Sequence, residues 1–395
     1  NHFTKDWQYE WISGVVYGMQ TAGADWKETL SYVLTVELGF DELKNVGSVY
    51  YHTTRMIALL VHVDDPLIKA KAKENMMWLQ NELKERFDIK GEFTNLENDV
   101  AIDFMSMRIQ KTRGGNITLD NQNKIMEYLE ELGMQDCNPV KEPMNKTILK
   151  MLAENRDAEM MADEEEMAQI MKYEGKLQWI AQTTHPLLST SVSILASLKK
   201  YKIAGHFKAI KHIFRWLQGV KTHALVNWKG RVKNLSMDSD ADYAGLYAIL
   251  GEKRSRSGMK AAIGAFLYAW YSRYQQCRGT EVEEIEADHG DMEWDMAISS
   301  AESEIHGAAD ACKEALHYKH ASEELGIDIG GEKMIIRIDA SAAYGWIYST
   351  ATVSKLKHID MRLTWVRMIQ KLKEVEFRRV PGPDNGADPF TKILQ

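Results

Sequence analysis

Residues 235–245 read LSMDSDADYAG, and this stretch decides the fold of the C-terminal part of the chain. Side chains alternate between the two faces of a strand, so Asp238, Asp240 and Asp242 are expected on one face. Asp240 is expected at the strand end, where loops that carry active sites are usually built. A solvated acidic strand edge is the alternative for these three aspartates.

The DSDAD run within this stretch also resembles the start of a calcium-binding EF-hand loop. Position 6 of that loop would be Tyr243, where glycine is needed, and position 12 would be Ile249, where glutamate is needed. The sequence therefore excludes an EF-hand at this place.

Strands and helices alternate in the residues that follow. The patterns predict strands at 259–271, 334–339 (MIIRID) and 374–380, and helices at 301–325, 340–348 and 358–372. Residues 280–296 contain eight acids and neither lysine nor arginine, which predicts a solvated insertion. Alternating strands and helices indicate an α/β domain with a mixed sheet.

Four carboxylates from four of these elements could converge on one cluster. Asp240 ends the first strand, Glu304 is expected in the first turn of the long helix, Asp339 ends the MIIRID strand, and Asp388 stands in NGADPFTK. Such acids would repel one another unless divalent cations lay between them. Two Mg²⁺ ions about 4 Å apart, held by such acids, form a phosphodiester-cleaving arrangement.

Each of these acids also has an ordinary structural explanation. Glu304 could be an acid favoured by the helix dipole. Asp339 could cap the helix that follows it. Asp388 could belong to a turn in the tail. Taken singly, these explanations are as good as the functional one, and the order of the four acids favours the cluster.

The N-terminal part reads as an α+β unit. The sequence predicts a strand at 55–63, a break at Asp64 and Asp65, and Pro66 at a turn exit or in an edge strand. It further predicts a helix at 72–87, a hairpin within 102–119, and a helix at 125–132 with Gly133 as its C-cap.

The middle of the chain is expected to be helical for the most part. The acidic segment 151–168 is predicted to be a mobile connector or an exposed helix, and three amphipathic helices are predicted around 173–182, 186–200 and 206–218.

The composition is that of a globular protein, with 45% hydrophobic and 27% charged residues among 395. No apolar run reaches the roughly 18 residues of a membrane span. Three distant cysteines exclude a cysteine-based zinc site and indicate a reducing compartment. The formal net charge of -8 gives no global attraction to nucleic acid, so a surface that binds it must be local.

One such local surface is predicted on the helix around 206–218. Lys208, Lys211 and Arg215 recur at helical spacing and share one face, which favours contact with nucleic-acid phosphates. A solvated face opposite the apolar side of the helix is an equally good interpretation.

Eight ordered blocks resemble the reverse transcriptase and RNase H part of copia-type (Pseudoviridae) retrotransposon polyproteins. They are YGMQTAGADW (17–26), LLVHVDDPLI (59–68), LGMQDCNPVKEPM (132–144), YEGKLQWIAQTTHP (173–186), SDADYAG (239–245), SSAESEIHGAADACKEA (299–315), KHIDMR (357–362) and NGADPFTK (385–392). The family's versions of the second, fifth and last blocks are LLVYVDDLLI, SDADWAG and QLADIFTK. The resemblance runs through nearly the whole chain.

The resemblance implies functional residues at matching positions. Asp240, Glu304, Asp339 and Asp388 match the four RNase H metal acids, with Glu302 as the second choice for the glutamate, and Asp64 and Asp65 match the aspartate pair of the polymerase palm. The palm's third aspartate lies well before the first block in the family, and Asp6 lacks its motif context. Further departures from the family's residues stand at Gly23, Asp25, His62, Pro66 and Thr364.

The resemblance also implies an architecture and a function. Residues 1–150 are expected to be a partial palm, 151–232 an acidic linker and helical connection, and 233–395 an α/β RNase H-like domain. The expected activity is two-Mg²⁺ hydrolysis of the RNA strand of RNA/DNA hybrids, with Mn²⁺ as a substitute, and RNA-templated DNA synthesis in the full polyprotein. The alternative is a decayed or domesticated copy that only binds nucleic acid or protein.

The partners implied by the resemblance are the hybrid, a template-primer nucleic acid and other parts of the Pol polyprotein, with no membrane. The implied location is intracellular, in a cytoplasmic particle or the nucleus.

Overall fold

The computed structural model describes residues 21–89, 93–97, 100–230, 235–275, 297, 299–326, 333–349 and 360–393. The acidic segment 280–296, the start of the block at 17–26 and the expected boundary at 232 lie outside these residues. The chain divides into unit 1, Asn1–Thr94 with Glu323–Gly326, and unit 2, Asn95–Ser322 with Ile327–Gln395. The boundary expected at residue 150 falls inside a helix, Lys146–Asp157.

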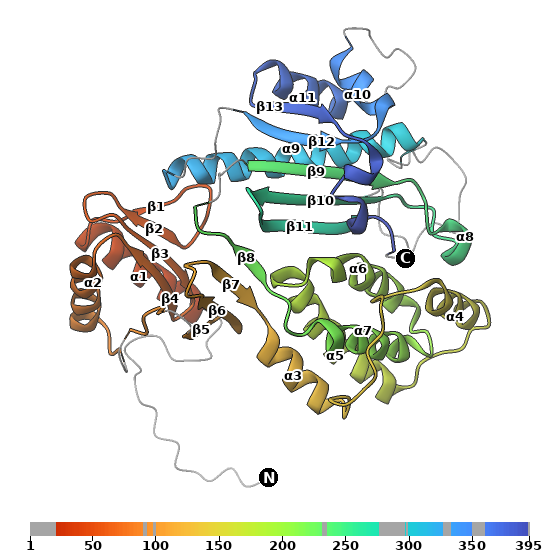
Figure 1. Cartoon of the computed structure of the whole chain (residues 1–395), viewed down its shortest axis with the longest axis horizontal. Coiled ribbons are helices and arrows are strands. Elements are labelled where there is room, and N and C mark those ends of the chain that lie inside the picture. Colours follow the sequence, from red (N-terminus) through yellow and green to blue (C-terminus); the bar gives the residue numbers. More distant parts are fainter. Residues whose placement is uncertain are drawn as a thin grey trace, which may run out of the picture. The chain divides into compact units, whose positions relative to one another are not determined.

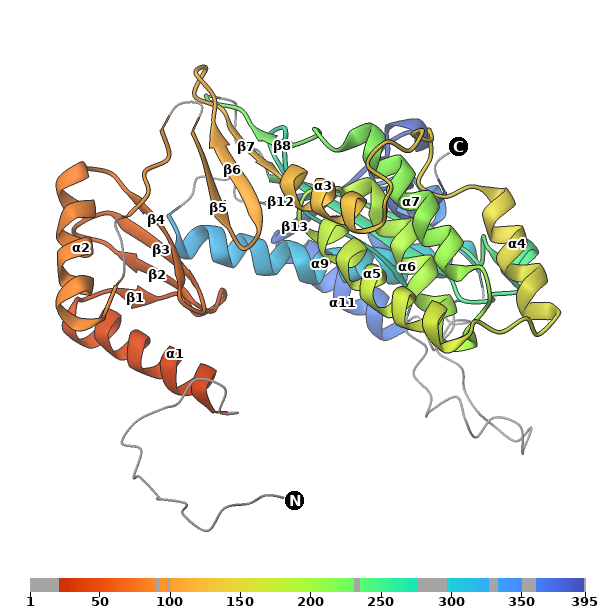
Figure 2. The same cartoon turned by 90° about the horizontal axis from the view of Figure 1, so that it is seen from below.

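Unit 1 is a four-stranded antiparallel sheet with two helices. The strands, in sheet order, are β1 (Asp41–Glu42), β2 (Val49–His52), β3 (Ile57–His62) and β4 (Asp65–Ala70). Helices α1 (Ala22–Tyr32) and α2 (Lys73–Arg86) lie beside this sheet (Figure 2). The apolar side chains of Leu34, Ile57, Leu59 and Leu79 form its core.

The turn between β3 and β4 differs from the prediction by one residue. His62 pairs with Asp65, so the two-residue loop consists of Val63 and Asp64 rather than of the aspartate pair. Val63 has a φ of 54°, an uncommon conformation for a β-branched residue. Pro66 lies in β4 at the edge of the sheet, as predicted, where a missing N–H costs no hydrogen bond.

Unit 2 begins with a second antiparallel sheet. Its order is β5 (Ala101–Phe104), β6 (Met107–Lys111), β7 (Ile117–Asp120) and β8 (Leu225–Asn227). The predicted hairpin at 102–119 is therefore a three-stranded meander, because Met105 and Ser106 form a tight turn with positive φ angles. Helix α3 (Gln122–Glu131) follows, and Gly133, with a φ of 61°, ends it as predicted.

A helical layer comes next. It contains α4 (Lys146–Asp157), α5 (Glu164–Thr183), α6 (Ser189–Leu198) and α7 (His206–Val220), with short 3-10 turns at Pro186–Leu188 and Lys199–Tyr201. The three amphipathic helices are confirmed. Of the two alternatives for 151–168, the mobile connector is wrong, because most of the segment is helical: it contains the end of α4 and the start of α5. The exposed helix is correct only in part, since α4 buries Leu152 and Ala153.

A five-stranded mixed sheet completes unit 2 (Figure 1). In sheet order its strands are β11 (Phe266–Tyr274), β10 (Arg256–Ile263), β9 (Leu235–Asp242), β12 (Met334–Ile338) and β13 (Val375–Arg379). The first three are antiparallel, and β12 runs parallel to both β9 and β13. The mixed sheet is confirmed, but the strand predicted at 259–271 is a hairpin that turns at Gly264.

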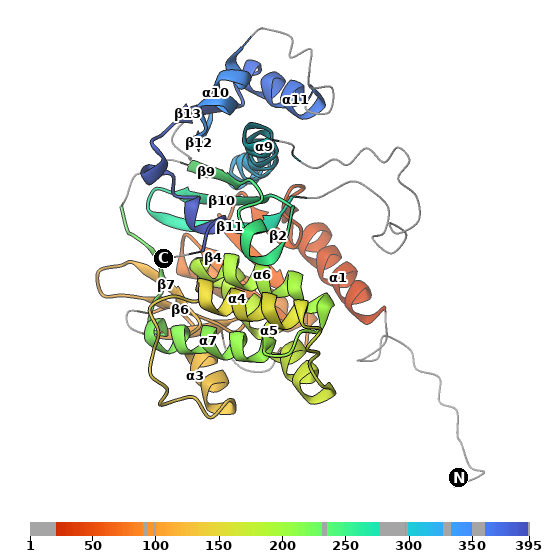
Figure 3. The ribbon, with the colours of Figure 1, turned by 90° about the vertical axis from the view of Figure 1, so that its right-hand side faces the viewer.

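The helices of this sheet are α8 (Tyr247–Leu250), α9 (Ser300–Glu324), α10 (Ser341–Tyr348) and α11 (Asp360–Lys371). Figure 3 shows α9 on one face of the sheet and the C-terminal 3-10 turns, Gly382–Asp384 and Asp388–Phe390, on the other side. The helical layer contacts the five-stranded sheet at β11, where the indole Nε1 of Trp270 donates to the carbonyl of Ala181 on α5 at 2.7 Å. None of the helices in the described part of the chain combines the length and apolar character of a membrane span.

Candidate functional site

Two of the predicted acids are brought together by parallel strand pairing. In the register of β9 and β12, Ser236, Met237 and Asp238 lie opposite Ile335, Ile336 and Arg337, in that order. Continuing this register by two residues places Asp339 beside Asp240. The carboxyl ends of the two parallel strands therefore carry one carboxylate each at the same edge of the sheet.

The third acid comes from α9. The helix approaches β9 closely at Gly307, because a Cβ there would lie 3.3 Å from Ser239 Oγ and 3.4 Å from the Asp240 carbonyl oxygen. Glu304, one turn before Gly307, thereby reaches the ends of the strands. The helix begins at Ser300, so its first turn holds Glu302, and Glu304 lies just beyond it rather than within it as predicted.

The carboxylates of Asp240, Glu304 and Asp339 form one cluster, whose ligand atoms all lie within 4.8 Å of one another. In the described part of the chain, Glu304 Oε2 is buried with no hydrogen-bond partner. Burial, followed by the charges of Asp240 and Asp339, raises the pKa of Glu304 to about 9. Burial also raises the pKa of Asp240, whose side chain is almost fully buried. A set of oxygen donors with this unbalanced charge fits a hard divalent cation.

The fourth predicted acid, Asp388, lies close by but outside the group of three. Its Oδ1 accepts a hydrogen bond from the Nζ of Lys392, which also lies 3.8 Å from Asp240 Oδ2. The neighbouring Thr391 donates its hydroxyl proton to Asp240 Oδ2. The structure thus joins Asp388 to Asp240 through a lysine and not through direct proximity.

Several structural alternatives for these acids are wrong. Asp238 and Asp240 do not lie on a solvated edge, because β9 is the central strand and both residues are buried. Asp238 is paired with Arg337 Nη2 at 2.8 Å and Lys260 Nζ at 3.2 Å. Asp339 does not cap α10, since the N-cap position belongs to Ala340 and has no side-chain hydrogen bond.

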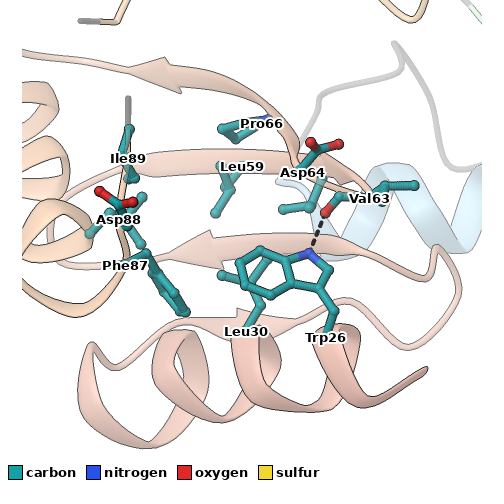
Figure 4. Close-up of a pocket in the computed structure, with 11 residues that line it drawn as sticks. Trp26, Leu30, Leu59, Val63, Asp64, Pro66, Phe87, Asp88 and Ile89 are labelled. Atoms are coloured by element: carbon teal, nitrogen blue, oxygen red, sulfur yellow. Dashed lines mark hydrogen bonds between the residues drawn. The ribbon is translucent and has the colours of Figure 1, made fainter. Parts of the chain in front are cut away.

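The predicted palm aspartates, Asp64 and Asp65, are exposed at the β3–β4 hairpin. Among the described residues, they belong to no group of three or more potential metal ligands. Asp64 lines a mainly apolar cavity of about 430 Å³ (Figure 4). The indole Nε1 of Trp26 on α1 donates to the Val63 carbonyl at 2.6 Å and ties this helix to the hairpin tip.

The predicted basic face on α7 is only partly available to a ligand. Lys208 and Lys211 are exposed, and the Nζ of Lys211 lies 4.7 Å from the ring centre of Phe207. Arg215 is half-buried and donates through Nε to the carbonyl of Asn138 at 2.9 Å, so part of its guanidinium serves the fold. None of the three residues belongs to the acid cluster.

Known proteins resemble the chain over most of its length. The reverse transcriptase (RNA-dependent DNA polymerase) family matches residues 4–146. The Pol polyprotein of transposon TNT 1-94 from Nicotiana tabacum is 24% identical over 87% of this chain, and that of transposon RE2 from Arabidopsis thaliana is 25% identical over 96%. The chain is similar to the Pol polyproteins of copia-type transposons.

The chain spans 24% of the length of each of those two polyproteins. Among solved structures, it is similar to the N-terminal RNase H domain of a Mycobacterium tuberculosis protein, at 10% identity and a TM-score of 0.26, covering 40% of this chain and 91% of that one. RNase H1 from Halobacterium salinarum matches at 11% identity and the same TM-score, covering 39% of this chain and 90% of that one.

The match to the reverse transcriptase family includes the hairpin with Asp64 and Asp65 but ends before the acid cluster. Sequence reasoning did not single out Thr391 and Lys392, which contact the cluster from the C-terminal segment. The signal was present, because both residues stand in the NGADPFTK block directly after Asp388. A hydroxyl and an ammonium group beside a carboxylate that is predicted to bind metal can hold that carboxylate in place.

Proposed function

We propose that unit 2 is a metal-dependent nuclease of the RNase H type, which cleaves the RNA strand of RNA/DNA hybrids. The observation that carries this proposal is the cluster of Asp240, Glu304 and Asp339, three carboxylates from three elements with a buried oxygen that lacks a partner among the described residues. The similarity to transposon Pol polyproteins supports nucleic acid as the class of substrate.

The proposed cofactor is a pair of Mg²⁺ ions, for which Mn²⁺ could substitute. Asp240, Glu304 and Asp339 would hold one ion, and Asp240 together with Asp388 would hold the other. When bound, such ions activate a water molecule and stabilise the leaving 3′ oxygen. The carboxylate donors of the site suit these cations, which prefer oxygen ligands.

The residues of the chain would fix the geometry before the substrate arrives. Asp240 lies on the central strand of the sheet and receives a hydrogen bond from the buried Thr391 hydroxyl, which restricts its rotation. The Ala241 backbone N–H supports the carboxylate of Glu304. Held on a strand and a long helix, these side chains lose little further entropy when a ligand binds.

The substrate would be recognised by its backbone. Lys208 and Lys211 expose ammonium groups that suit nucleic-acid phosphates. The 2′-hydroxyl of the RNA strand is the group that distinguishes it from DNA. In a longer polyprotein, Asp64 and Asp65 would join a third aspartate from elsewhere in the chain for RNA-templated DNA synthesis.

The test is a cleavage assay on a labelled RNA/DNA hybrid with Mg²⁺. The wild-type chain should cut the RNA strand, and Asp240→Asn and Asp339→Asn should lower the rate at least about 100-fold, since each removes a proposed metal ligand. Asp384→Asn, a substitution in the neighbouring 3-10 turn at Gly382–Asp384, serves as a matched control and should cut like the wild type.

Equal cleavage by the wild type and both cluster variants would contradict the proposal, and so would no cleavage by any of them. Hybrid binding without cleavage would favour the alternative, a decayed copy that only binds nucleic acid. A steep loss of binding with added salt would show that the binding is dominated by phosphate contacts.

A further inference from the structure

Lys392 is a cation at the candidate site, and it lies between two carboxylates. Its Nζ donates to Asp388 Oδ1 and is 3.8 Å from Asp240 Oδ2. Asp240 is buried, whereas Asp388 is 44% exposed, so the lysine bridges an inner and an outer acid. A positive charge in this position balances two carboxylates that would otherwise repel each other.

The charge of Lys392 also reaches the rest of the cluster. It lowers the pKa of Asp240 and of Glu304, against the effect of burial, which raises both. It acts in the same direction on Asp242, two residues further along β9. Burial remains the largest influence, so the pKa values of Asp240 and Glu304 stay above their ordinary values.

Contacts with α6, β10 and β9 hold the backbone segment that carries Lys392. Thr190 on α6 donates its hydroxyl proton to the Pro389 carbonyl at 2.8 Å. Gly258 on β10 lets the segment approach the sheet, because a Cβ there would lie 2.8 Å from Phe390 Cβ and 2.8 Å from Thr391 Cγ2. Thr391 itself is hydrogen-bonded to Asp240.

The side chain of Lys392, by contrast, is 50% exposed. An exposed ion pair is weak, because water screens it and the long side chain loses entropy when it is held in one place. The ammonium can therefore leave Asp240 and Asp388 while the backbone stays in place, which a buried pair could not do.

We propose that Lys392 occupies, in the metal-free protein, the place of a cation shared by Asp240 and Asp388, and that a second divalent ion binds only when this ammonium leaves. The inference rests on the proposed function, which assigns metal ions to these acids. An ion held by Asp240, Glu304 and Asp339 would bind without displacing the lysine. The two ions should consequently differ in affinity, and Lys392 should set the affinity of the weaker one.

The experiment is a calorimetric titration of the full, metal-free chain with Mn²⁺ in the absence of nucleic acid. The variant Lys392→Met keeps the length of the side chain and removes its charge. Its weaker Mn²⁺ site should bind about tenfold more tightly than in the wild type, which corresponds to about 1.4 kcal/mol, while the tighter site changes little. Lys392→Arg keeps the charge and should retain the weak second site.

The matched control is Lys260→Met. Lys260 lies 3.2 Å from Asp238 Oδ2, on the strand next to β9, so this variant removes one charge near the cluster without removing a bridge within it. It should tighten the weaker site much less than Lys392→Met does. Thermal melting of each metal-free variant establishes that it is folded.

Three outcomes would overturn the inference. Unchanged Mn²⁺ binding by Lys392→Met, in a chain whose wild type binds two ions, contradicts it and leaves the proposed function intact. An equal effect of Lys260→Met would show that Lys392 weakens Mn²⁺ binding only by adding positive charge near the cluster, and not by occupying the place of the ion. Absence of Mn²⁺ binding by the wild type removes the proposed metal site, and the inference with it.

Discussion

A buried carboxylate such as Asp240 needs hydrogen-bond donors as well as cations, and the hydroxyl of Thr391 supplies one. The bond joins the C-terminal segment to the central strand, so one residue contributes both to stability and to the orientation of the acid. A hydrogen bond from a hydroxyl to a charged acceptor is among the stronger hydrogen bonds in proteins. Its removal should therefore affect both properties.

Thr391→Val replaces this hydroxyl with a methyl group of similar size. The unfolding free energy of the metal-free protein should fall by about 1–3 kcal/mol, because the buried Asp240 loses a donor, and hybrid cleavage should fall about tenfold. Chemical denaturation in the presence of a chelator and the cleavage assay measure the two effects. Thr190→Val removes the hydrogen bond that Thr190 on α6 donates to the Pro389 carbonyl of the same segment, and it should cost stability and lower cleavage less than Thr391→Val does.

A second residue-scale prediction concerns His206, the fully buried first residue of α7, whose ring nitrogens have no partner among the described residues. Burial lowers its pKa to about 4. Between pH 6.5 and 4 the unfolded chain therefore binds a proton that the folded chain does not, and stability falls as the pH falls through this window.

The variant His206→Leu should lose less stability than the wild type between pH 7 and pH 4, by up to about 3 kcal/mol. Urea denaturation at a series of pH values measures the difference. Identical slopes for His206→Leu and the wild type would contradict this account.

At the scale of elements, the sequence predicts best where periodicity is sustained. Helices α5, α7 and α9 and the strand β12 follow from their patterns, because each has a continuous apolar face. Tight turns inside apolar runs were missed at Met105 and Gly264, since a two-residue turn does not interrupt the alternation of a strand. For the end of α4 the sequence leaves a connector and an exposed helix open, because the many acids there give no sign of the buried Leu152.

The candidate site follows the same rule. Asp240, Glu304 and Asp339 could be predicted because each lies near one end of an element, and parallel pairing then brings Asp240 and Asp339 together. The predicted positions were slightly off, because β9 continues to Asp242 and α9 begins at Ser300. The position of Asp388 outside this group, in a salt bridge with Lys392, could not be predicted. Side-chain pairing of this kind leaves no periodic pattern in a sequence.

Gly258 provides an element-scale prediction. In Gly258→Ala, the new Cβ would overlap Phe390 and Thr391, so the segment 388–392 should move off β10 and the protein should lose about 1–3 kcal/mol. Faster amide hydrogen exchange in this segment and reduced cleavage of the hybrid should accompany the loss. Gly345→Ala, at a helical position where a Cβ meets nothing, should be neutral or mildly stabilising.

At the scale of the whole molecule, the chain consists of two compact units, and all proposed nuclease residues belong to unit 2. The predicted boundaries at 150 and 232 did not anticipate the division near residue 94, because the β5–β8 sheet takes its last strand from beyond the helical layer. Such a long-range pairing cannot be seen in local sequence patterns.

A fragment of residues 95–395 should therefore cleave the hybrid with the same Mg²⁺ dependence as the full chain. The cleavage assay, run on both proteins at equal concentration, makes the comparison. A fragment that is folded by circular dichroism but inactive, beside an active full chain, would show that unit 1 contributes to the reaction.

The 395-residue chain should not extend a primer on an RNA template. Among the described residues, no third acid joins Asp64 and Asp65, and a polymerase site needs more ligands than this pair provides. A primer-extension assay with Mg²⁺ and nucleotides tests this, with hybrid cleavage by the same preparation as the positive control. Robust extension would contradict this prediction.

The pairing of β7 with β8 sets an order of events during folding. Leu119 and Leu225 are register partners, although the helical layer lies between them in the sequence. Closing a loop of about a hundred residues has an entropic cost that local contacts do not have, and a preformed helical layer shortens the flexible part of that loop. We expect β8 to join its sheet late, after the helices have assembled, so newly made chains would carry an open β7 edge until residue 227 has been synthesised.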